Sequence, residues 1–229
     1  MEGAKAVYSY RPAANISRLD QAVRRIDPKA DEFPEVDCAQ PDFWSQRYQS
    51  GRTPWQLDYV PQRLATFINV LPAGAEILIP GSGGDWRTIR AFHEAGHYIK
   101  AIDFSPVAVE RARKPLGKVA DTLILGDFFS YDFGPRRFDV IYERTFLCSL
   151  PPQLWENYVN RVAQLLRPKG KLAGFFLYGE ETDPPPYPLT ETYAKKLFAG
   201  RFELIRNEAV ADSLPIFRGM EKWQEWALL

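Results

Sequence analysis

Residues 76–86 read EILIPGSGGDW, an apolar run that ends in a cluster of three glycines. The amphipathic pattern PQRLATFINVL (61–71) precedes this run and WRTIRAFHEAG (86–96) follows it, which is typical of a strand between two helices. Glycine lets the backbone turn sharply and approach a ligand, because no Cβ stands in the way. A plain tight turn uses the same residues, so the loop alone does not decide between the two.

The rhythm of strand and helix continues towards the C-terminus. Further strands are predicted in HYIKAIDFS (97–105), TLILGDFF (122–129), RFDVIYERTF (137–146) and KLAGFFLYG (171–179), and further helices in PVAVERARKPLG (106–117), PQLWENYVNRVAQLLRPKG (152–170) and LTETYAKKLFAG (189–200). Ser105 is the predicted cap of the helix at Pro106, and the helix after Pro152 is predicted to end before Pro168. Apolar strands that alternate with helices indicate an α/β, Rossmann-like parallel sheet with helices on both faces.

Two late strands, FELIRNEAV (202–210) and EKWQEWALL (221–229), are joined by a short link. This spacing predicts an antiparallel hairpin at the C-terminal edge of the sheet. We expect one domain over residues 41–229, preceded by a partly irregular extension over residues 1–40 with a short amphipathic segment from Ile16 to Ile26.

The composition is that of an ordinary globular chain, with 45% apolar and 25% charged residues. The 29 Lys and Arg balance 29 Asp and Glu, which argues against a nucleic-acid partner. No apolar run approaches the roughly 20 residues of a membrane span, and the N-terminus lacks the apolar core of a signal peptide. We therefore expect a cytoplasmic protein with no membrane partner.

Metal-binding spacings are nearly absent. Cys38 and Cys148 are far apart, and neither belongs to a CxxC motif. His93 and His97 stand four residues apart, but His97 follows Gly96 and is predicted to lie beyond the helix end. Because a tetrahedral site needs three or four ligands, we expect no metal.

Asp103 lies at the end of the strand that follows the glycine loop, 22 positions after Gly81. Rossmann-type folds place an acidic residue at about this distance to bind ribose hydroxyls. The alternative is that Asp103 caps the helix at Pro106, for which Ser105 competes. With the glycine loop in register, ribose binding is the favoured interpretation.

The order of residues in the glycine loop favours S-adenosylmethionine over a dinucleotide as the bound cofactor. The dinucleotide fingerprint G-x-G-x-x-G seats a pyrophosphate, whereas this loop reads GSGGD (81–85). A sulfonium cofactor has no phosphates, and Asp85 beside the loop suits a cationic ligand. At the end of the next predicted strand, the Asp127 carboxylate is placed to accept a hydrogen bond from an adenine amino group. The Phe128 ring beside it is placed to pack against the adenine. Asp127 is equally typical of a turn.

Six segments together resemble the thiopurine methyltransferase family, and more closely its branch of plant and microbial halide and thiol methyltransferases. They are FWSQRYQSGRTPW (43–55), ILIPGSGGDW (77–86), AIDFSPVAVE (101–110), GDFF (126–129), FDVIYERTFLCSLPP (138–152) and LAGFF (172–176). The patterns W-x-x-R-Y-x-x-G-x-T-P-W and Y-E-R-x-F-L-C-x-L are more specific than the glycine loop. The resemblance implies a class I methyltransferase with a mostly parallel seven-stranded sheet, S-adenosylmethionine as the donor and no metal.

Carried over by position, the resemblance implies a cofactor site that closes under the segment from Trp44 to Trp55. The residues assigned to cofactor binding are Trp44, Arg47, Thr53, Trp55, Gly81, Ser82, Gly83, Asp103, Phe104, Asp127, Phe128 and Glu143. Gly81 is expected to meet the amino-acid portion of the cofactor, and tryptophan faces attract a sulfonium by cation–π contact. The two tryptophans are alternatively core aromatics. Many relatives have a cysteine where Ser82 stands, an exchange that backbone contacts tolerate.

The predicted reaction is in-line methyl transfer to a small nucleophile, which leaves S-adenosylhomocysteine. The donor is already activated, so the main task is to hold the acceptor about 3 to 3.5 Å from the methyl carbon. A thiol is partly ionised near neutral pH, and thiocyanate or a halide needs no base. Arg144 is predicted to attract an anionic acceptor, or else to pair with Glu143 or another carboxylate. Tyr178 and Tyr187 are predicted to donate hydrogen bonds to the acceptor.

Other functions stay open at this point. The same fold can methylate oxygen or nitrogen of a small aromatic metabolite, with Glu143, Asp127 or a tyrosine as the base. A second alternative is a nicotinamide-dependent oxidoreductase, but the dinucleotide fingerprint is incomplete in this sequence. A third is a module that binds S-adenosylmethionine without turnover. The sequence predicts a small-molecule acceptor and a monomer or weak homo-oligomer.

Overall fold

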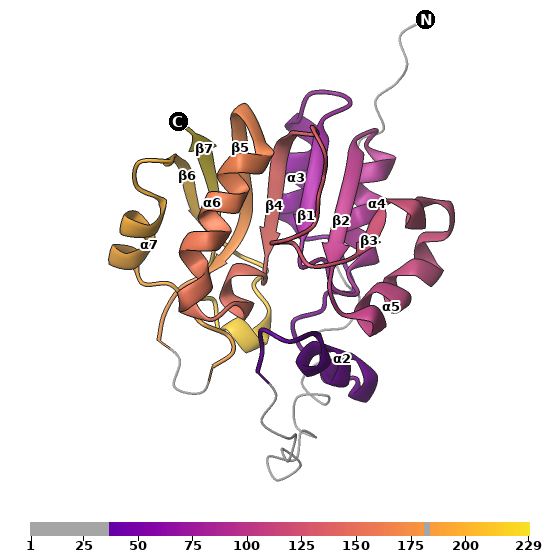
Figure 1. Ribbon diagram of the computed structural model, residues 1–229. Helices are drawn as coiled ribbons and strands as arrows, with labels where there is room; N and C mark the ends of the chain where they lie inside the picture. Colours follow the sequence, from indigo (N-terminus) through magenta and orange to yellow (C-terminus); the bar gives the residue numbers. More distant parts are fainter. Residues whose placement is uncertain (1–36, 181–183) are drawn as a thin grey trace, which may run out of the picture.

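The computed structural model of the protein describes residues 37–180 and 184–229. Its strands are β1 (Glu76–Pro80), β2 (Tyr98–Asp103), β3 (Leu123–Leu125), β4 (Phe138–Arg144), β5 (Leu166–Leu177), β6 (Phe202–Ala209) and β7 (Glu221–Leu228). Its helices are α2 (Pro41–Ser50), α3 (Gln62–Val70), α4 (Trp86–Glu94), α5 (Pro106–Leu116), α6 (Trp155–Leu165) and α7 (Glu191–Phe198). Figure 1 shows the sheet between two sets of helices. The predicted segment Ile16–Ile26 lies outside the described residues.

The described strands form one seven-stranded sheet in the order β3-β2-β1-β4-β5-β7-β6. All neighbours from β3 to β5 pair in parallel. Strand β7 runs antiparallel to both β5 and β6. The predicted parallel sheet and its antiparallel C-terminal hairpin are therefore confirmed. Because β1 pairs with both β2 and β4, the strand order reverses beside β1, which is where open α/β sheets bind ligands.

Both faces of the sheet are covered because successive strand residues point to opposite sides. Ile77 and Ile79 of β1 belong to a core with α3, α4 and α5, whereas Leu78 belongs to a second core with α6 and α7. The largest side chain of the first core is Trp223, which is fully buried between Phe67 and Phe175. These apolar faces supply the main stabilisation of the fold.

Two helices begin with a side chain that caps their first turn, and one of these two caps was predicted from the sequence. Ser105 Oγ accepts from the backbone N–H of Ala108 at 3.2 Å, so Ser105 caps α5 as predicted. The Asp85 carboxylate caps α4 and accepts from both the backbone N–H and the hydroxyl of Thr88. His97 lies beyond the end of α4, as expected.

The predicted end of α6, before Pro168, is wrong by two residues. The helix stops at Leu165, and residues 166–170, of which Leu166 and Arg167 were expected to be helical, already belong to β5. Their pairing with β4 contains a register shift between Phe138 and Val140, opposite Leu166 and Lys171. A bulge of this kind accommodates a proline that regular sheet pairing would exclude.

No helix in the described part of the chain combines the length and apolar character needed to cross a membrane. Among the same residues, no group of three or more His, Cys, Asp or Glu side chains is arranged to hold a metal ion. Cys38 and Cys148 are both buried and free.

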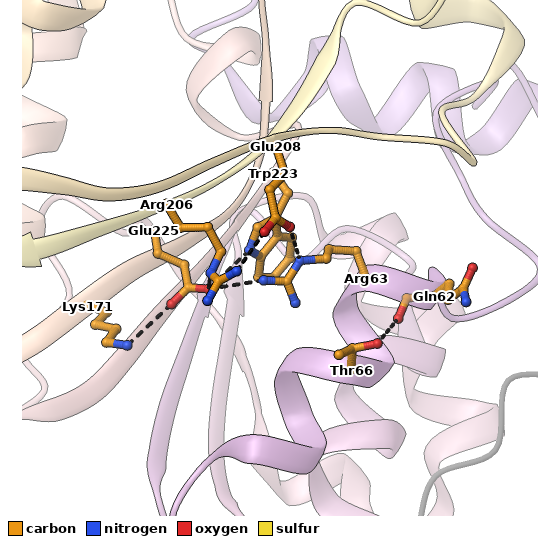
Figure 2. A network of polar contacts seen from close by, with 8 residues as sticks. All are labelled: Gln62, Arg63, Thr66, Lys171, Arg206, Glu208, Trp223 and Glu225. Carbon is orange, nitrogen blue, oxygen red and sulfur yellow. Dashed lines mark hydrogen bonds and ion pairs between the residues drawn. The ribbon is translucent and has the colours of Figure 1, made fainter.

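A buried carboxylate joins the C-terminal hairpin to the rest of the sheet and to α3. Glu225 on β7 is 5% exposed. It pairs with Arg63 at 3.2 Å, Lys171 at 3.2 Å and Arg206 at 3.0 Å, as Figure 2 shows. One of its oxygens also lies 3.3 Å from the indole nitrogen of Trp223. A single side chain thus connects β5, β6, β7 and α3.

Replacing this carboxylate should destabilise the fold. We expect Glu225→Ala to lower the free energy of unfolding by about 3 kcal/mol, because three cations and a buried indole N–H lose a shared acceptor. Urea denaturation of both proteins measures the difference. Glu191→Ala is the control, since Glu191 forms an exposed pair with Lys222, and its effect should stay below about 0.5 kcal/mol. Equal effects in the two variants would contradict the structural role of Glu225.

Candidate active site

A cavity of about 220 Å³ lies at the carboxyl end of the parallel strands, and we call it the main cavity. Figure 1 shows α2 below the arrowheads of the central strands, at this end of the sheet. The residues that line the main cavity are Cys38, Ala39, Trp44, Tyr48, Trp55, Gly81, Gly83, Ile102, Asp103, Phe104, Gly126, Asp127, Phe128, Phe129, Thr145, Phe146, Ser149, Leu150 and Leu154. They come from α2 and the residues on either side of it, from the end of β2 and from the segments that follow β1, β2, β3 and β4.

The glycine loop passes close to two aromatic side chains. Gly81 and Gly83 have φ angles of 56° and 55°, which favour glycine. A Cβ at Gly81 would lie 2.2 Å from the ring of Phe146, and one at Gly83 would lie 2.2 Å from the Tyr48 hydroxyl. The loop therefore needs glycine both for its turn and for its neighbours.

Asp103 faces the main cavity and is held by two backbone amides. Its Oδ2 accepts from Gly83 N–H and its Oδ1 from Ser105 N–H, both at 2.8 Å. Since Ser105 caps α5, the alternative that Asp103 is the cap is wrong. Burial raises the pKa of Asp103 to about 6, and the two amide hydrogen bonds oppose this shift. Each oxygen keeps acceptor capacity for a further donor.

Asp127 and Phe128 also line the main cavity, together with Phe104 beside Asp103. The Asp127 carboxylate accepts from Phe129 N–H at 3.1 Å and from the Ser130 hydroxyl at 2.8 Å, so it forms the turn that the sequence left as an alternative. Its place in the cavity wall shows that this turn does not remove Asp127 from the site.

The segment from α2 to Trp55 covers the main cavity with aromatic rings. Trp44 and Trp55 meet edge to face, with ring centroids 5.6 Å apart, and Tyr48 packs against Trp55 at 6.2 Å. The Tyr48 hydroxyl accepts from Gly84 N–H at 3.2 Å and so joins this cover to the glycine loop. Sequence reasoning missed Tyr48, although its position four residues after Trp44 puts both on one face of a helix.

Arg47 and Thr53 from the same segment do not line the main cavity. The Arg47 guanidinium lies 3.4 Å from the centroid of Phe43. The Thr53 hydroxyl donates to the side chain of Gln56 at 2.7 Å. Both side chains brace the aromatic cover from outside.

A second, smaller cavity of about 40 Å³ lies beside the glycine loop, and we call it the polar cavity. It shares Tyr48, Trp55, Gly81, Gly83 and Thr145 with the main cavity and is also lined by Gln56, Leu57, Ile79, Pro80, Ser82, Asp85, Tyr142 and Arg144. Ser82 Oγ, Tyr142 Oη and Arg144 Nε are buried and have no hydrogen-bond partner within residues 37–180 and 184–229. Because buried polar atoms are rarely left unpaired, these three indicate a place for a polar ligand group or water.

Two contacts hold the Arg144 guanidinium, and its Nε has no hydrogen-bond partner among the described residues. Its Nη1 donates to the Trp55 carbonyl at 3.1 Å, and its Nη2 lies 3.9 Å from Glu221 Oε1. The carboxylate partner is thus Glu221, and the predicted pairing with Glu143 is not found. Glu221 is itself buried and accepts from the Ser213 hydroxyl at 2.7 Å. Sequence reasoning missed Glu221 because it comes from the distant C-terminal strand.

Glu143 lies in the core and lines neither cavity. Its Oε1 accepts from the backbone N–H groups of Phe146 and Leu147 at 2.8 and 2.9 Å, and its Oε2 accepts from the Tyr158 hydroxyl at 2.6 Å. Burial raises the pKa of Glu143 to about 7, and its three donors oppose the shift. The side chain fixes the turn after β4 and is separated from both cavities, so the structure does not support its predicted place in the site.

The two predicted acceptor tyrosines differ in position. Tyr178 is buried and its hydroxyl donates to Gln224 at 3.1 Å, so it lies within the sheet and lines neither cavity. Tyr187 is partly exposed, and its hydroxyl lies 3.8 Å from Sγ of Cys38, which lines the main cavity. The structure thus brings only Tyr187 near the edge of the site.

The order of the seven-stranded sheet, with a glycine loop after β1 and an acid at the end of β2, is that of a class I S-adenosylmethionine-dependent methyltransferase. The sequence model of the family described as thiopurine S-methyltransferase matches residues 39–226. The chain therefore belongs to this family, as the sequence patterns predicted.

Solved structures share the fold. A 1,6-didemethyltoxoflavin-N1-methyltransferase from Burkholderia thailandensis, with S-adenosylhomocysteine bound, has a TM-score of 0.67 and 19% identity, covering 96% of this chain and 93% of its own. The magnesium protoporphyrin IX methyltransferase from Synechocystis PCC 6803, with bound S-adenosylmethionine, has a TM-score of 0.63 and 15% identity, covering 85% and 99%.

Relatives in sequence carry related names. A probable thiol methyltransferase 2 from Arabidopsis thaliana is 29% identical, covering 80% of this chain and 83% of its own. A thiocyanate methyltransferase 1 from Brassica oleracea is 26% identical with the same coverage, 80% and 83%. A thiopurine S-methyltransferase from Methylococcus capsulatus is 28% identical, covering 78% and 90%.

The buried Glu143 carboxylate should make stability depend on pH. Its pKa is about 7 in the folded protein against an ordinary 4.5, so the folded state holds the proton more tightly than the unfolded state. The free energy of unfolding should therefore fall as pH rises from about 4.5 through about 7, by up to about 3 kcal/mol. Glu143→Gln should remove this contribution, as measured by urea denaturation at a series of pH values, and leave the decline that Asp103 contributes as pH rises through about 6. The exposed Glu156→Gln is the control and should keep the full wild-type decline; an equal decline in Glu143→Gln and in the wild type would refute the assignment.

Proposed function

We propose that this methyltransferase transfers the methyl group of S-adenosylmethionine to a small soft nucleophile, such as a thiol, a thiopurine, thiocyanate or a halide. The observation that carries this proposal is the chemistry of the junction between the two cavities. The residues common to both are Tyr48, Trp55, Gly81, Gly83 and Thr145. None of them is a base near neutral pH, and burial raises the pKa of Tyr48 further.

A junction without a base suits a nucleophile that needs no deprotonation by the protein. Halides and thiocyanate are anions already, and a thiol is partly ionised near neutral pH. A phenol is a weaker acid than a thiol and would gain from a general base. The names of the relatives, which include thiol, thiocyanate and thiopurine methyltransferases, agree with this reasoning.

The two cavities suit the two ends of the cofactor. Asp103 is placed to accept from ribose hydroxyls, and Asp127 with Phe128 to bind the adenine. Ser82, Tyr142 and Arg144, which have unpaired polar atoms, all line the polar cavity. A carboxylate bound there would accept hydrogen bonds from these atoms. We therefore assign Arg144 to the carboxylate of the cofactor, whereas the sequence suggested that it binds the acceptor.

S-adenosylmethionine, when bound, supplies a methyl group on a positively charged sulfur that leaves as a neutral thioether. The protein's part is to align the acceptor with this group and to exclude water. The faces of Trp44 and Trp55 attract a cation at the main cavity, and Arg144 fixes Trp55 through its carbonyl oxygen. The acceptor forms its bond to the methyl carbon as the carbon–sulfur bond breaks, and a thiol proton passes to solvent.

We assign residues 41–229 to the methyltransferase domain and residues 1–40 to an extension of it. A cytoplasmic location is also proposed, supported by the balanced charge and by the free cysteines at Cys38 and Cys148. The protein is proposed to work as a monomer or a weak homo-oligomer. Tyr187, beside Cys38, is the tyrosine that we propose to border the acceptor.

Removing the Asp103 carboxylate should weaken cofactor binding. We expect Asp103→Ala to lower the affinity for S-adenosylhomocysteine roughly 10- to 100-fold, because hydrogen bonds to a charged acceptor are lost. Wild-type affinity should also decrease as pH falls through about 6, since protonation removes acceptor capacity from this group. Isothermal titration calorimetry measures both effects. Asp121→Ala, an exposed acid away from the cavities, should bind as the wild type does; equal affinity of Asp103→Ala and wild type would refute ribose binding.

A panel of acceptors tests the proposed reaction. We expect kcat/KM for a thiol, a thiopurine, thiocyanate or iodide to exceed that for a phenol or a ring nitrogen by roughly a hundredfold, because the junction offers no general base. Formation of S-adenosylhomocysteine measures every acceptor in the same way. A phenol or ring nitrogen that reacts faster would favour the alternative O- or N-methyltransferase. Binding of S-adenosylhomocysteine without turnover of any acceptor would favour a non-catalytic module.

A further inference from the structure

Thr145 adopts a backbone conformation that β-branched residues rarely occupy. Its φ is 60°, immediately after the end of β4. Two other non-glycine residues of the described chain have positive φ, namely Lys169 and Arg218, and neither is β-branched. Strained residues of this type concentrate at functional sites, where the surrounding structure holds them.

The turn itself explains the conformation but not the residue type. Glu143 accepts from the N–H groups of both Phe146 and Leu147, so the chain must reverse at Thr145. Glycine or asparagine adopts this conformation with less strain. The side chain of Thr145 therefore requires a reason beyond the turn.

The position of Thr145 suggests that reason. Thr145 lines both the main cavity and the polar cavity, at the junction where the methyl group would lie. None of the hydrogen bonds formed within the described chain involves its hydroxyl. The polar ends of the cofactor already have partners in Asp103 and in the unpaired atoms of the polar cavity. A sulfonium accepts no hydrogen bond, so the acceptor is the group at the junction that still needs a polar partner.

We infer that Thr145 is an acceptor-binding residue, whose hydroxyl donates a hydrogen bond to the nucleophilic atom and directs it at the methyl carbon. This inference rests on the proposed function. It names a single donor, and a thiolate or halide that accepts one hydrogen bond keeps further lone pairs for attack on the methyl carbon. It also accounts for a β-branched residue in a strained turn, because branching restricts χ1 and fixes the direction of the hydroxyl.

Two substitutions separate the hydroxyl from the shape of the side chain. Thr145→Val keeps the branched shape and the strain but removes the donor, and Thr145→Ser keeps the donor. We expect Thr145→Val to lower kcat/KM for a thiol roughly tenfold, because one hydrogen bond to the acceptor is lost, and Thr145→Ser to stay within about threefold of the wild type. The affinity of both variants for S-adenosylhomocysteine should be unchanged, since the hydroxyl binds the acceptor.

A third variant tests the strain. Thr145→Gly should raise the midpoint of thermal unfolding by about 2 to 4 °C and at the same time lower kcat/KM at least as far as Thr145→Val does. Lys169→Gly is the matched control, because Lys169 has a similar φ of 65° but lies at the start of β5, away from both cavities. It should keep full activity. If Thr145 had only a structural role, relieving its strain would raise the midpoint of thermal unfolding without lowering kcat/KM.

The outcomes are distinct. Full activity of Thr145→Val, equal losses in Thr145→Val and Thr145→Ser, or a parallel loss of S-adenosylhomocysteine affinity would each overturn the inference while the wild type remains an active methyltransferase. If Thr145→Val does not fold, Thr145→Gly decides: a folded, inactive protein supports the inference and a fully active one overturns it. A wild-type protein that methylates no soft nucleophile refutes the proposed function, and the inference with it.

Discussion

The buried carboxylate of Glu143 holds together the end of β4, on which both cavities depend. It accepts from two consecutive backbone N–H groups, those of Phe146 and Leu147, and from the hydroxyl of Tyr158 on α6. A carboxylate is one of the few groups that satisfies three donors in the core, where unpaired donors are costly. The chain therefore reverses at a fixed point, and Phe146 comes to rest against the glycine loop.

This turn places side chains on either side of the glycine loop. Phe146 packs where a Cβ at Gly81 would stand, so loop and turn are mutually dependent. Arg144, just before the turn, contacts the carbonyl of Trp55 and so ties the aromatic cover to β4. The cover, the loop and the turn thus form one unit, although they come from three separate parts of the sequence. A substitution in any one of them should therefore change the packing of the other two.

Local patterns in the sequence predict the parts of the site that local forces determine. The glycine loop, the cap at Ser105 and the acid at Asp103 follow from short-range stereochemistry and from the strand and helix period. The approach of Glu221 on β7 to Arg144 on β4 depends on how strands far apart in the sequence are arranged in the sheet, which periodicity does not encode. A family pattern also brings in Arg47, which does not line the main cavity because a helix points only some of its side chains at a cavity, and Thr53, whose hydroxyl bonds to Gln56 beyond the end of α2.

The boundary of β5 shows the same limit. The sequence after α6 has good helical residues up to Pro168, and local propensity favours a longer helix. Pairing with β4 overrides it, because the strand hydrogen bonds and the buried face of β5 outweigh the last turn of a helix. Fold class and the type of each element are therefore more predictable than the ends of the elements.

The separation of charges across the site bears on how a turnover ends. The aromatic faces of Trp44 and Trp55 attract a cation, and this attraction disappears once the sulfur has become neutral. In the proposed complex, the acids at Asp103 and Asp127 and the donors of the polar cavity would contact the parts of the cofactor that do not change. Binding at the two ends would then be the same before and after transfer, and the difference would be confined to the aromatic centre. Interactions that differ between states, and not those common to them, set the balance between catalysis and release.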